Sequence, residues 1–375
     1  MAEKYSMKDD LYNLEKVTKL AAEIKVVYVD FNQEVFVQST VEKFPDLELK
    51  ERMFHIRDRL VEHLPSDYEE ALGIIIKALP PELDASKKDD DFGDFIYAPY
   101  GEFVTAYGCS EVYLDISLKA LREITKRFSV EFAIRDFINT FPKETYLMLE
   151  ACSNSSHYHE RRLASEGLRL KLPWAKKIDI DYRNNIALLD NLYMDDTRFV
   201  VRSVANHLND ISKIDLPLVL ETLKRWKDSG KQHEKEITFL INHALRTSIK
   251  NGDEETLNFL GYRSNPHIFV EHFTLKSDKI NIGEAVEFTF QVDASKHEKL
   301  ILDYIVYFRT KKGTLNPKVH KLKKLVIGMD ESVVLSKKHL FKANMSTRTF
   351  YEGEHSIALQ INGKIYETRT FNLTI

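Results

Sequence analysis

Three nine-residue stretches decide the fold of this chain: HERRLASEG (159–167), FVVRSVANH (199–207) and FLINHALRT (239–247). They recur every 40 residues, a spacing within the range of HEAT and armadillo repeats. Two positions of the repeat carry polar side chains in all three copies. These positions are Arg162, Arg202 and Asn242, and then Glu166, Asn206 and Arg246. Equivalent helices line one face of a solenoid, so these side chains are expected to point into one groove.

A second helical pattern lies between the copies, as in YRNNIALLDNLY (182–193) and DLPLVLETLKRW (215–226). Each pair of helices forms a hairpin that buries its apolar face only by stacking on its neighbours. The pattern therefore predicts an α-solenoid. Chance similarity between amphipathic helices is the alternative, because the three copies are weak.

The periodicity changes near residue 265. Alternation with a period of two replaces helical spacing in EAVEFTFQV (284–292), LDYIVYF (302–308) and EHSIALQI (354–361). About seven strands separated by turns are typical of an immunoglobulin-like sandwich. We therefore predict a multidomain chain, with an all-α HEAT-like repeat solenoid at 1–264 and an all-β immunoglobulin-like sandwich at 265–375.

The composition excludes several classes of protein. With 43% hydrophobic and 30% charged residues the chain is typical of a soluble globular protein, and no apolar run approaches the roughly 20 residues of a membrane helix. Two cysteines make neither a disulfide framework nor a zinc site, so we expect a protein of the reducing cytoplasm. The net charge of −4 still allows a local basic face. No cofactor and no metal are expected, and HYHE (157–160) is interpreted as structural.

The stretch SEGLRLKLPWA (165–175) places a glutamate and a tryptophan among basic residues. Arg162 lies four residues before Glu166, so a salt bridge on one helix is the simplest interpretation. Pro173 ends the helix and fixes the direction of Trp174. A tryptophan held in this way is either a packing residue or, if exposed, a platform for a base, a sugar or a cation.

A second glutamate, Glu131, stands in SVEFAIRDFI (129–138), near the start of a predicted helix. A favourable interaction with the helix dipole would explain it alone. Together with Glu166, however, it forms a carboxylate pair, which is the usual apparatus for cleaving a glycosidic bond.

These stretches resemble the AlkC branch of bacterial DNA alkylation repair proteins, which are HEAT-like repeat DNA glycosylases related to AlkD. The resemblance rests on RFSVEFAIRDFI (127–138), HYHERRLASEGLRLKLPWA (157–175) and DDTRFVVRSVANHLNDISK (195–213). In the second half, LDYIVYFRTKKGTLNPKVHKLKKL (302–325) resembles the immunoglobulin-like domain that part of the family carries. The similarity extends from about residue 95 to the end.

The resemblance implies an activity and a set of site residues. The implied reaction is hydrolysis of the N-glycosidic bond of N3-alkylated bases in base excision repair, chiefly 3-methyladenine, with 3-methylcytosine as a second substrate. By the same resemblance Glu131, Glu166 and Trp174 surround the damaged nucleotide. Leu170 stands where many members of the family have a proline, and we expect it to loosen the approach to Trp174.

The partner implied by the resemblance is double-stranded DNA containing alkylated bases, bound by a monomer away from membranes. We therefore expect a bacterial cytoplasmic protein that is associated with the nucleoid when it is bound to DNA. We expect basic and amide side chains to contact the DNA backbone, which gives affinity without sequence information. In the solenoid these are Arg162, Arg169, Lys171, Arg202 and Asn206, and in the predicted hairpin tip of the sandwich they are Lys311, Lys312 and Asn316. An ordinary solvated hairpin tip is the alternative for the last three.

Two other functions compete with a glycosylase. Most helical-repeat solenoids are adaptors, so a non-catalytic scaffold is one alternative. A protein that binds damaged DNA without chemistry is the other. The carboxylate pair beside Trp174 separates them from a glycosylase, because an adaptor has no need for it.

Overall fold

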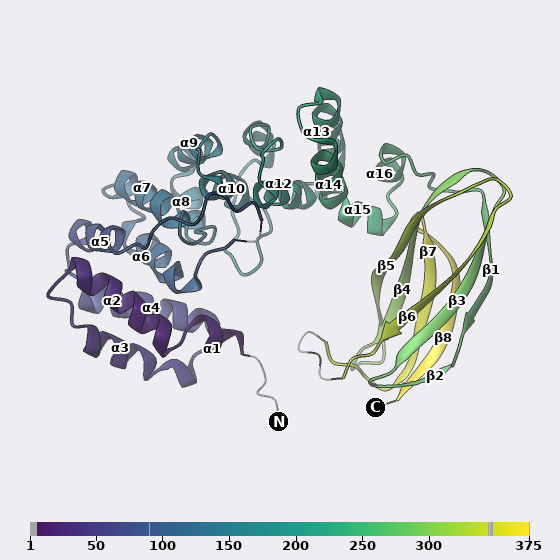
Figure 1. The fold of residues 1–375 in the computed structure, drawn as a ribbon, viewed down its shortest axis with the longest axis horizontal. Coiled ribbons are helices and arrows are strands. Elements are labelled where there is room, and N and C mark those ends of the chain that lie inside the picture. Colours follow the sequence, from purple (N-terminus) through teal and green to yellow (C-terminus); the bar gives the residue numbers. More distant parts are fainter. Residues whose placement is uncertain (1–5, 90, 344, 346–347, 375) are drawn as a thin grey trace. The chain divides into compact units, whose positions relative to one another are not determined.

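The computed structural model describes residues 6–89, 91–343, 345 and 348–374. It divides into two compact units, Met1–Ala244 and Leu245–Ile375 (Figure 1). The first is all helical, and the second is a β-sandwich preceded by two short helices. The predicted fold class is therefore confirmed. No helix among the described residues combines the length and the apolar character needed to cross a membrane.

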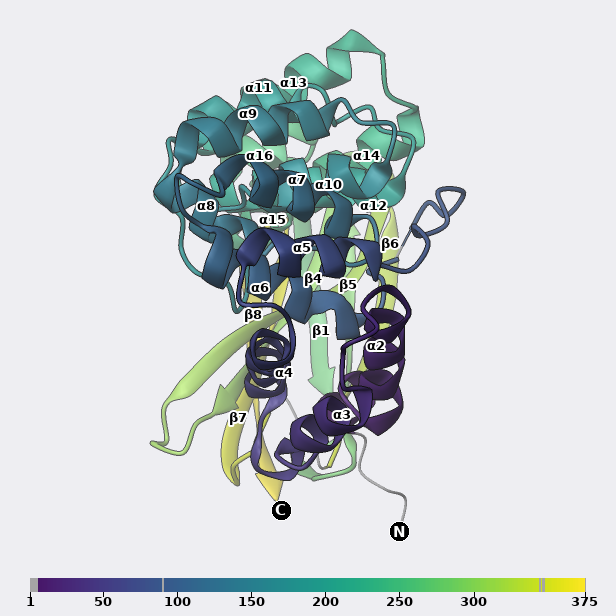
Figure 2. The same ribbon diagram turned by 90° about the vertical axis from the view of Figure 1, so that its left-hand side faces the viewer.

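The first unit is a stack of helices in two layers. Its α-helices are α1 (Met7–Leu11), α2 (Leu14–Val27), α3 (Gln33–Val41), α4 (Leu49–His63), α5 (Tyr68–Lys77), α6 (Ala98–Gly108), α7 (Leu114–Thr125), α8 (Ile134–Thr140), α9 (Pro142–Ser153), α10 (Tyr158–Glu166), α11 (Asn185–Leu189), α12 (Arg198–Ile211), α13 (Leu216–Ser229) and α14 (Glu234–Ala244). Short 3₁₀ helices occur at η1 (Phe44–Asp46), η2 (Phe95–Tyr97) and η3 (Tyr182–Asn184). Helices α5, α7, α9 and α13 lie along one edge in Figure 1, with α6, α8, α10 and α12 beneath them. In Figure 2, α9 and α13 again lie above α10 and α12.

The 40-residue repeat corresponds to helices that pack on one another. Helices α10 and α12 begin 40 residues apart, and α12 lies between α10 and α14. Its apolar stripe, which includes Val200, Val204 and Leu208, is completely buried. Stacking therefore buries what a single hairpin would leave exposed. The loop before α6 also joins this layer, since the backbone N–H of Phe199 donates to the carbonyl of Lys88 at 3.2 Å.

The second unit is a sandwich of two sheets. Its strands are β1 (Ile268–Leu275), β2 (Lys279–Asn281), β3 (Ala285–Ala294), β4 (Glu298–Arg309), β5 (Leu315–Ile327), β6 (Ser332–Leu340), β7 (Gly353–Ile361) and β8 (Lys364–Thr374). One sheet has the order β1-β3-β6 and the other β2-β8-β7-β4-β5. All pairs are antiparallel except β2 with β8. Alternate side chains of both sheets, such as Phe288, Val306 and Leu359, form one apolar core.

Two short helices, α15 (Arg246–Asn251) and α16 (Glu254–Phe259), belong to the second unit rather than to the solenoid. The backbones of Gly252 and Gly363 approach so closely that a Cβ on Gly363 would lie 2.0 Å from the Cα of Gly252. The side chain of Asn362 also donates to the carbonyl of Arg263 at 2.8 Å. The boundary predicted at 264/265 lies shortly before the first strand, whereas the two compact units divide between Ala244 and Leu245.

The contact between Gly252 and Gly363 should be essential for the second unit. Both glycines have positive φ, +70° and +79°, and neither has room for a methyl group. Gly363→Ala should therefore lower the stability of the sandwich by about 2 kcal/mol or more, from overpacking and left-handed strain together. Denaturant unfolding followed by hydrogen exchange of sandwich peptides measures this loss. Gly283→Ala in the same unit is the control for strain alone, because Gly283 also has a positive φ, +97°, but its Cβ would meet nothing within 4 Å.

Two histidines in edge-to-face contact should make the sandwich sensitive to acid. The rings of His320 on β5 and His339 on β6 lie 4.6 Å apart beside Tyr304. Burial lowers the pKa of His320 to about 4, assisted by the charge of Lys318, and burial beside His320 lowers the pKa of His339 to about 4.

Both pKa values lie below the value of 6.5 expected for histidine in the unfolded chain. As the pH falls below 6.5, the unfolded chain therefore binds more protons than the folded chain. The stability of the sandwich should thus be complete above about pH 6.5 and decline between pH 6.5 and 4. Hydrogen exchange of peptides from β5 and β6 across this range tests the decline. His320→Phe should flatten it, and an unchanged slope would contradict this origin.

Candidate functional site

A chain of buried ion pairs joins three neighbouring parts of the first unit. Nη1 of Arg162 on α10 lies 2.8 Å from Oε2 of Glu131, which precedes α8. Its Nη2 lies 3.9 Å from Oε2 of Glu166, at the end of α10. Nη1 of Arg169 lies 2.5 Å from Oε1 of Glu166, and its Nη2 lies 3.0 Å from Oδ2 of Asp210 on α12. Carboxylates and guanidinium groups therefore alternate from α8 to α12.

The carboxylate of Glu166 is fully occupied by this network. Besides Arg169, it accepts a hydrogen bond from the Ser203 hydroxyl at 2.6 Å, and the residue is only 4% exposed. Burial alone would raise the pKa of Glu166, but the charges of Arg162 and Arg169 and these hydrogen bonds hold it below its ordinary value. Glu166 is therefore an ionised carboxylate whose two oxygens are both engaged.

The carboxylate of Glu131 is only half occupied. Its Oε2 receives Arg162 and the hydroxyl of Ser129, while Arg162 also donates to Ser129 at 2.6 Å. Its Oε1 accepts no hydrogen bond from any described residue, and its side chain is more exposed than that of Glu166. One oxygen of Glu131 is thus held in place and the other is open.

Trp174 is displayed by a strained turn. The N–H of Ala175 donates to the carbonyl of Leu172 at 3.3 Å, with Pro173 and Trp174 between them. The φ of Trp174 is +66°, which together with the proline is the pattern of a type II turn. That turn normally has glycine at the third position, and an L-residue there costs about 1–2 kcal/mol. Trp174 is 66% exposed, so it is not a packing residue of the core.

Arg135 on α8 fastens the loop that carries Trp174. Its fully buried guanidinium donates to the carbonyls of Gly167 at 3.1 Å, Arg169 at 2.9 Å and Lys176. Asn139 on the same helix donates to the carbonyl of Lys177 at 3.0 Å. These bonds hold the loop on both sides of Trp174. The loop is therefore supported by α8 although Leu170 replaces the proline of many family members.

Two arginines that were predicted to contact phosphate are buried in the structure. Arg162 and Arg169 are both less than 10% exposed and are paired with carboxylates, and the ring of Phe199 lies 4.5 Å from the Arg162 guanidinium carbon. The prediction that Arg162 and Arg169 contact phosphate is therefore corrected, because a buried arginine between carboxylates has no open face for another anion. They position the two glutamates instead.

The other predicted DNA contacts lie closer to solvent. Lys171 is exposed. Arg202 is partly exposed and paired with Asp89, from the loop that precedes α6. Oδ1 of Asn206 accepts a hydrogen bond from Nε2 of His243 at 2.9 Å. In the second unit, Lys311, Lys312 and Asn316 are all exposed, the lysines at the tip of the β4–β5 hairpin and Asn316 at the start of β5.

Three residues of the network were missed from the sequence. They are Arg135, Ser203 and Asp210. Arg135 and Ser203 stand in the quoted motifs, four residues after Glu131 and one after Arg202, which is the only signal that pointed to them. Asp210 also stands in a quoted stretch (195–213), but nothing singled it out there, because a lone aspartate late in a helix is usually solvent-facing.

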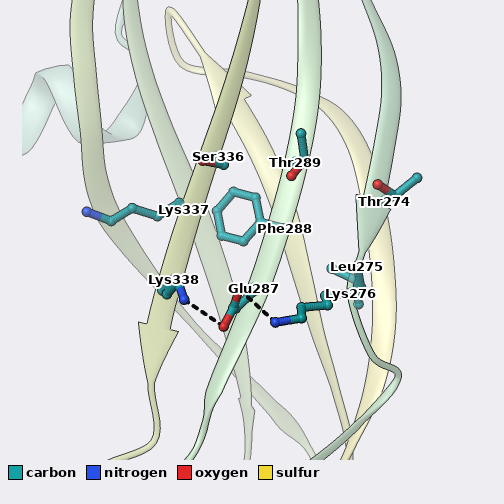
Figure 3. Close-up of a pocket in the computed structure, with 9 residues that line it drawn as sticks. All are labelled: Thr274, Leu275, Lys276, Glu287, Phe288, Thr289, Ser336, Lys337 and Lys338. Atoms are coloured by element: carbon teal, nitrogen blue, oxygen red, sulfur yellow. Dashed lines mark hydrogen bonds and ion pairs between the residues drawn. The ribbon is translucent and has the colours of Figure 1, made fainter.

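A separate depression of about 440 Å³ lies on the outer face of the three-stranded sheet (Figure 3). Glu287 binds Lys338 at 2.8 Å and Lys276 at 3.5 Å, and the hydrogen bond from Lys338 and the charge of Lys276 lower its pKa. Since both lysines are already paired with Glu287, the charge available to an anion is small. This face is a polar sheet surface rather than a second site.

The histidines of the HYHE segment are packed in the protein interior. His159 is buried beside Phe199, and burial lowers its pKa to about 3. His157 lies 3.7 Å from Glu82. Among the described residues no three histidine, cysteine, aspartate or glutamate side chains are placed to hold a metal ion. These rings therefore fill the core around α10.

Known proteins resemble this chain along its whole length. The family model of the C-terminal Ig-like domain of the uncharacterised protein YhaZ matches residues 269–375. The chain is 31% identical over 368 residues to the uncharacterised protein YhaZ of Bacillus subtilis strain 168, covering 97% of this chain and 98% of that protein.

A solved structure agrees with this relationship. The alkylpurine DNA glycosylase AlkC of Pseudomonas fluorescens, bound to DNA containing an abasic-site analogue, matches with a TM-score of 0.88 and 27% identity. The match covers 99% of this chain and 100% of that one. The chain therefore belongs to the family of AlkC and YhaZ, the branch of the helical-repeat DNA alkylation repair proteins that carries a C-terminal immunoglobulin-like domain.

Proposed function

We propose that this protein is a DNA glycosylase that releases N3-alkylated bases, chiefly 3-methyladenine, from double-stranded DNA. The observation that carries the proposal is the half-occupied carboxylate of Glu131, with one oxygen fixed by Arg162 and the other open. The full-length likeness to a DNA-bound alkylpurine glycosylase supports the substrate class. An abasic site is what remains after a base has been released.

The substrate supplies part of the chemistry itself. Alkylation at N3 makes the base cationic, so the bond from N to C1′ breaks with its electron pair passing to the base, which leaves as a neutral molecule. The sugar then carries positive charge, and a fixed carboxylate stabilises it. Water adds to C1′ and gives up a proton to the carboxylate or to solvent, which completes the hydrolysis.

The two glutamates have different roles in this proposal. Glu131 faces the reacting sugar or its attacking water through Oε1. Glu166 balances Arg162 and Arg169, so that Arg162 can hold Glu131 without adding an uncompensated positive charge. Glu166 is therefore a positioning residue, whereas Glu131 is the catalytic carboxylate.

The exposed residues provide contact with DNA. The indole of Trp174 offers its face to the cationic nucleotide, an interaction that favours the alkylated over the normal base. Lys171 and Arg202 contact phosphates of the solenoid-bound strand, with Asn206 beside them. The hairpin tip with Lys311, Lys312 and Asn316 adds contacts from the sandwich, and both sets give affinity without reading sequence.

Glu131→Gln should reduce the single-turnover rate of 3-methyladenine release by about 10²-fold or more, while DNA affinity stays near wild type. Its loss of stability should be smaller than that of Glu166→Gln, because Glu131 pairs with one guanidinium group and Glu166 with two. Glu166→Gln should reduce both the rate and the stability, the latter by about 3 kcal/mol, because it removes one member of a buried charge network. Release of free base from methylated DNA measures the rate, and urea unfolding measures the stability.

The base-release assay also decides between the three functions. Glu131→Gln that cleaves at the wild-type rate would contradict the catalytic role of Glu131. Wild-type protein that binds methylated DNA without releasing base would be a damaged-DNA binder. Protein that neither binds nor cleaves would be a non-catalytic scaffold.

Asp89 should compete with DNA phosphate for Arg202. Asp89→Asn removes the ion pair and should raise DNA affinity about two- to five-fold, the range expected for an exposed pair. Arg202→Ala should lower affinity on every sequence and reduce the slope of log K against log salt by about one. Fluorescence anisotropy titrations at several salt concentrations measure both effects.

The double variant provides the control for this competition. In the Arg202→Ala background, Asp89→Asn should leave affinity unchanged, because its effect acts through Arg202. An equal gain in both backgrounds would mean that Asp89 simply repels DNA.

A further inference from the structure

The strained turn at Trp174 has a partner from the beginning of the chain. The ammonium group of Lys50, on α4, donates a hydrogen bond to the main-chain carbonyl of Trp174. The two residues are separated by 124 positions in the sequence. That carbonyl belongs to the one residue of the turn with left-handed backbone, so the bond acts where the turn is most strained.

The same ammonium group also lies close to the segment that carries Glu131. Its nitrogen is 5.6 Å from the centroid of the Phe132 ring, and Phe132 directly follows Glu131. A cation over an aromatic ring is attracted by the ring face. Lys50 therefore contacts both the Trp174 turn and the segment that carries Glu131.

Lys50 stands on a well-anchored part of α4. The helix begins with a reciprocal capping box between Glu48 and Glu51. Two residues after Lys50, the buried guanidinium of Arg52 donates to the carbonyls of Phe44 at 3.1 Å and Tyr12 at 2.9 Å. The backbone from which Lys50 extends is therefore fixed on both sides, as a positioning role requires.

We propose that Lys50 is a positioning residue that holds Trp174 in its left-handed turn and sets the indole relative to Glu131. Arg135 fastens the ends of the loop, and Lys50 fixes its tip. The N-terminal helices thereby gain a role in the site, through one long-range contact. The proposal deepens the glycosylase function and rests on it only for its kinetic test.

The main alternative is a direct contact between Lys50 and a DNA phosphate, because the side chain is exposed. The two roles differ in what they change. A phosphate contact alters affinity and its salt dependence without altering the turn in free protein. A positioning contact alters Trp174 before any DNA is present.

The structural test uses 5-fluorotryptophan and ¹⁹F NMR on the full-length protein without DNA. The chain has two tryptophans, Trp174 and the buried Trp226, so two resonances are expected, and Trp174→Phe assigns them. Lys50→Met should broaden or shift the Trp174 resonance and leave that of Trp226 unchanged. Lys50→Arg keeps a hydrogen-bond donor, so its Trp174 resonance should again be single and sharp.

The kinetic test uses single-turnover release of 3-methyladenine. Lys50→Met should lower the rate about ten-fold while DNA affinity changes less than two-fold, and Lys50→Arg should recover most of the rate. Lys119→Met is the matched control, an exposed lysine on α7 whose only ion-pair partner among the described residues is Asp115. It should match wild type in both measurements.

The outcomes separate this proposal from the proposed function. An unchanged Trp174 resonance in Lys50→Met overturns the positioning role, whatever the activity. Loss of affinity and of one unit of salt slope with an unchanged resonance would assign Lys50 to phosphate. If wild-type protein releases no base, the glycosylase proposal fails, yet the ¹⁹F experiment still decides whether Lys50 holds the turn.

Discussion

The buried chain of alternating charges from Glu131 to Asp210 is the constraint on which the helical unit depends. An ionised carboxylate or guanidinium group is too costly to bury without a partner, so each member of the chain fixes its neighbour. Arg162 can lie inside only if Glu131 and Glu166 face it, and Arg169 only if Glu166 and Asp210 face it. The ion pairs that link α10 to the segment before α8 and to α12 therefore determine the position of the carboxylates.

The same network explains why two glutamates are not equivalent. Glu166 lies in the middle of the chain and is neutralised from both sides, whereas Glu131 lies at one end and is neutralised from one side only. A terminal member keeps an open oxygen and part of its negative charge. That is the position in which a carboxylate can stabilise positive charge developing on a sugar, because the field is already in place before the reaction begins.

Much of the fold and the centre of the site could be predicted from sequence, because both follow local patterns. The 40-residue period, the alternation after residue 265 and the stretches around Glu131, Glu166 and Trp174 are all visible in the printed chain. Arg162 and Arg169 were assigned to phosphate because a charged side chain on a helix normally faces water, and the sequence does not reveal the carboxylates that surround it. Lys50 and the contact between Gly252 and Gly363 depend on folding over more than 100 residues, which no local spacing encodes.

The strained turn at Trp174 indicates how this site would distinguish damage. Replacing Trp174 by glycine would remove the backbone strain, but it would also remove the aromatic ring. If the turn kept Trp174 but adopted an unstrained backbone, the ring would move away from the carboxylates. Proline, left-handed backbone and a distant lysine together hold an exposed indole still, so its ring face is available without closure of a pocket. A site of this kind responds to the charge of a nucleotide more than to its shape. In the function we propose, selectivity would come from the cation on the alkylated base and from its weakened glycosidic bond, next to the open oxygen of Glu131.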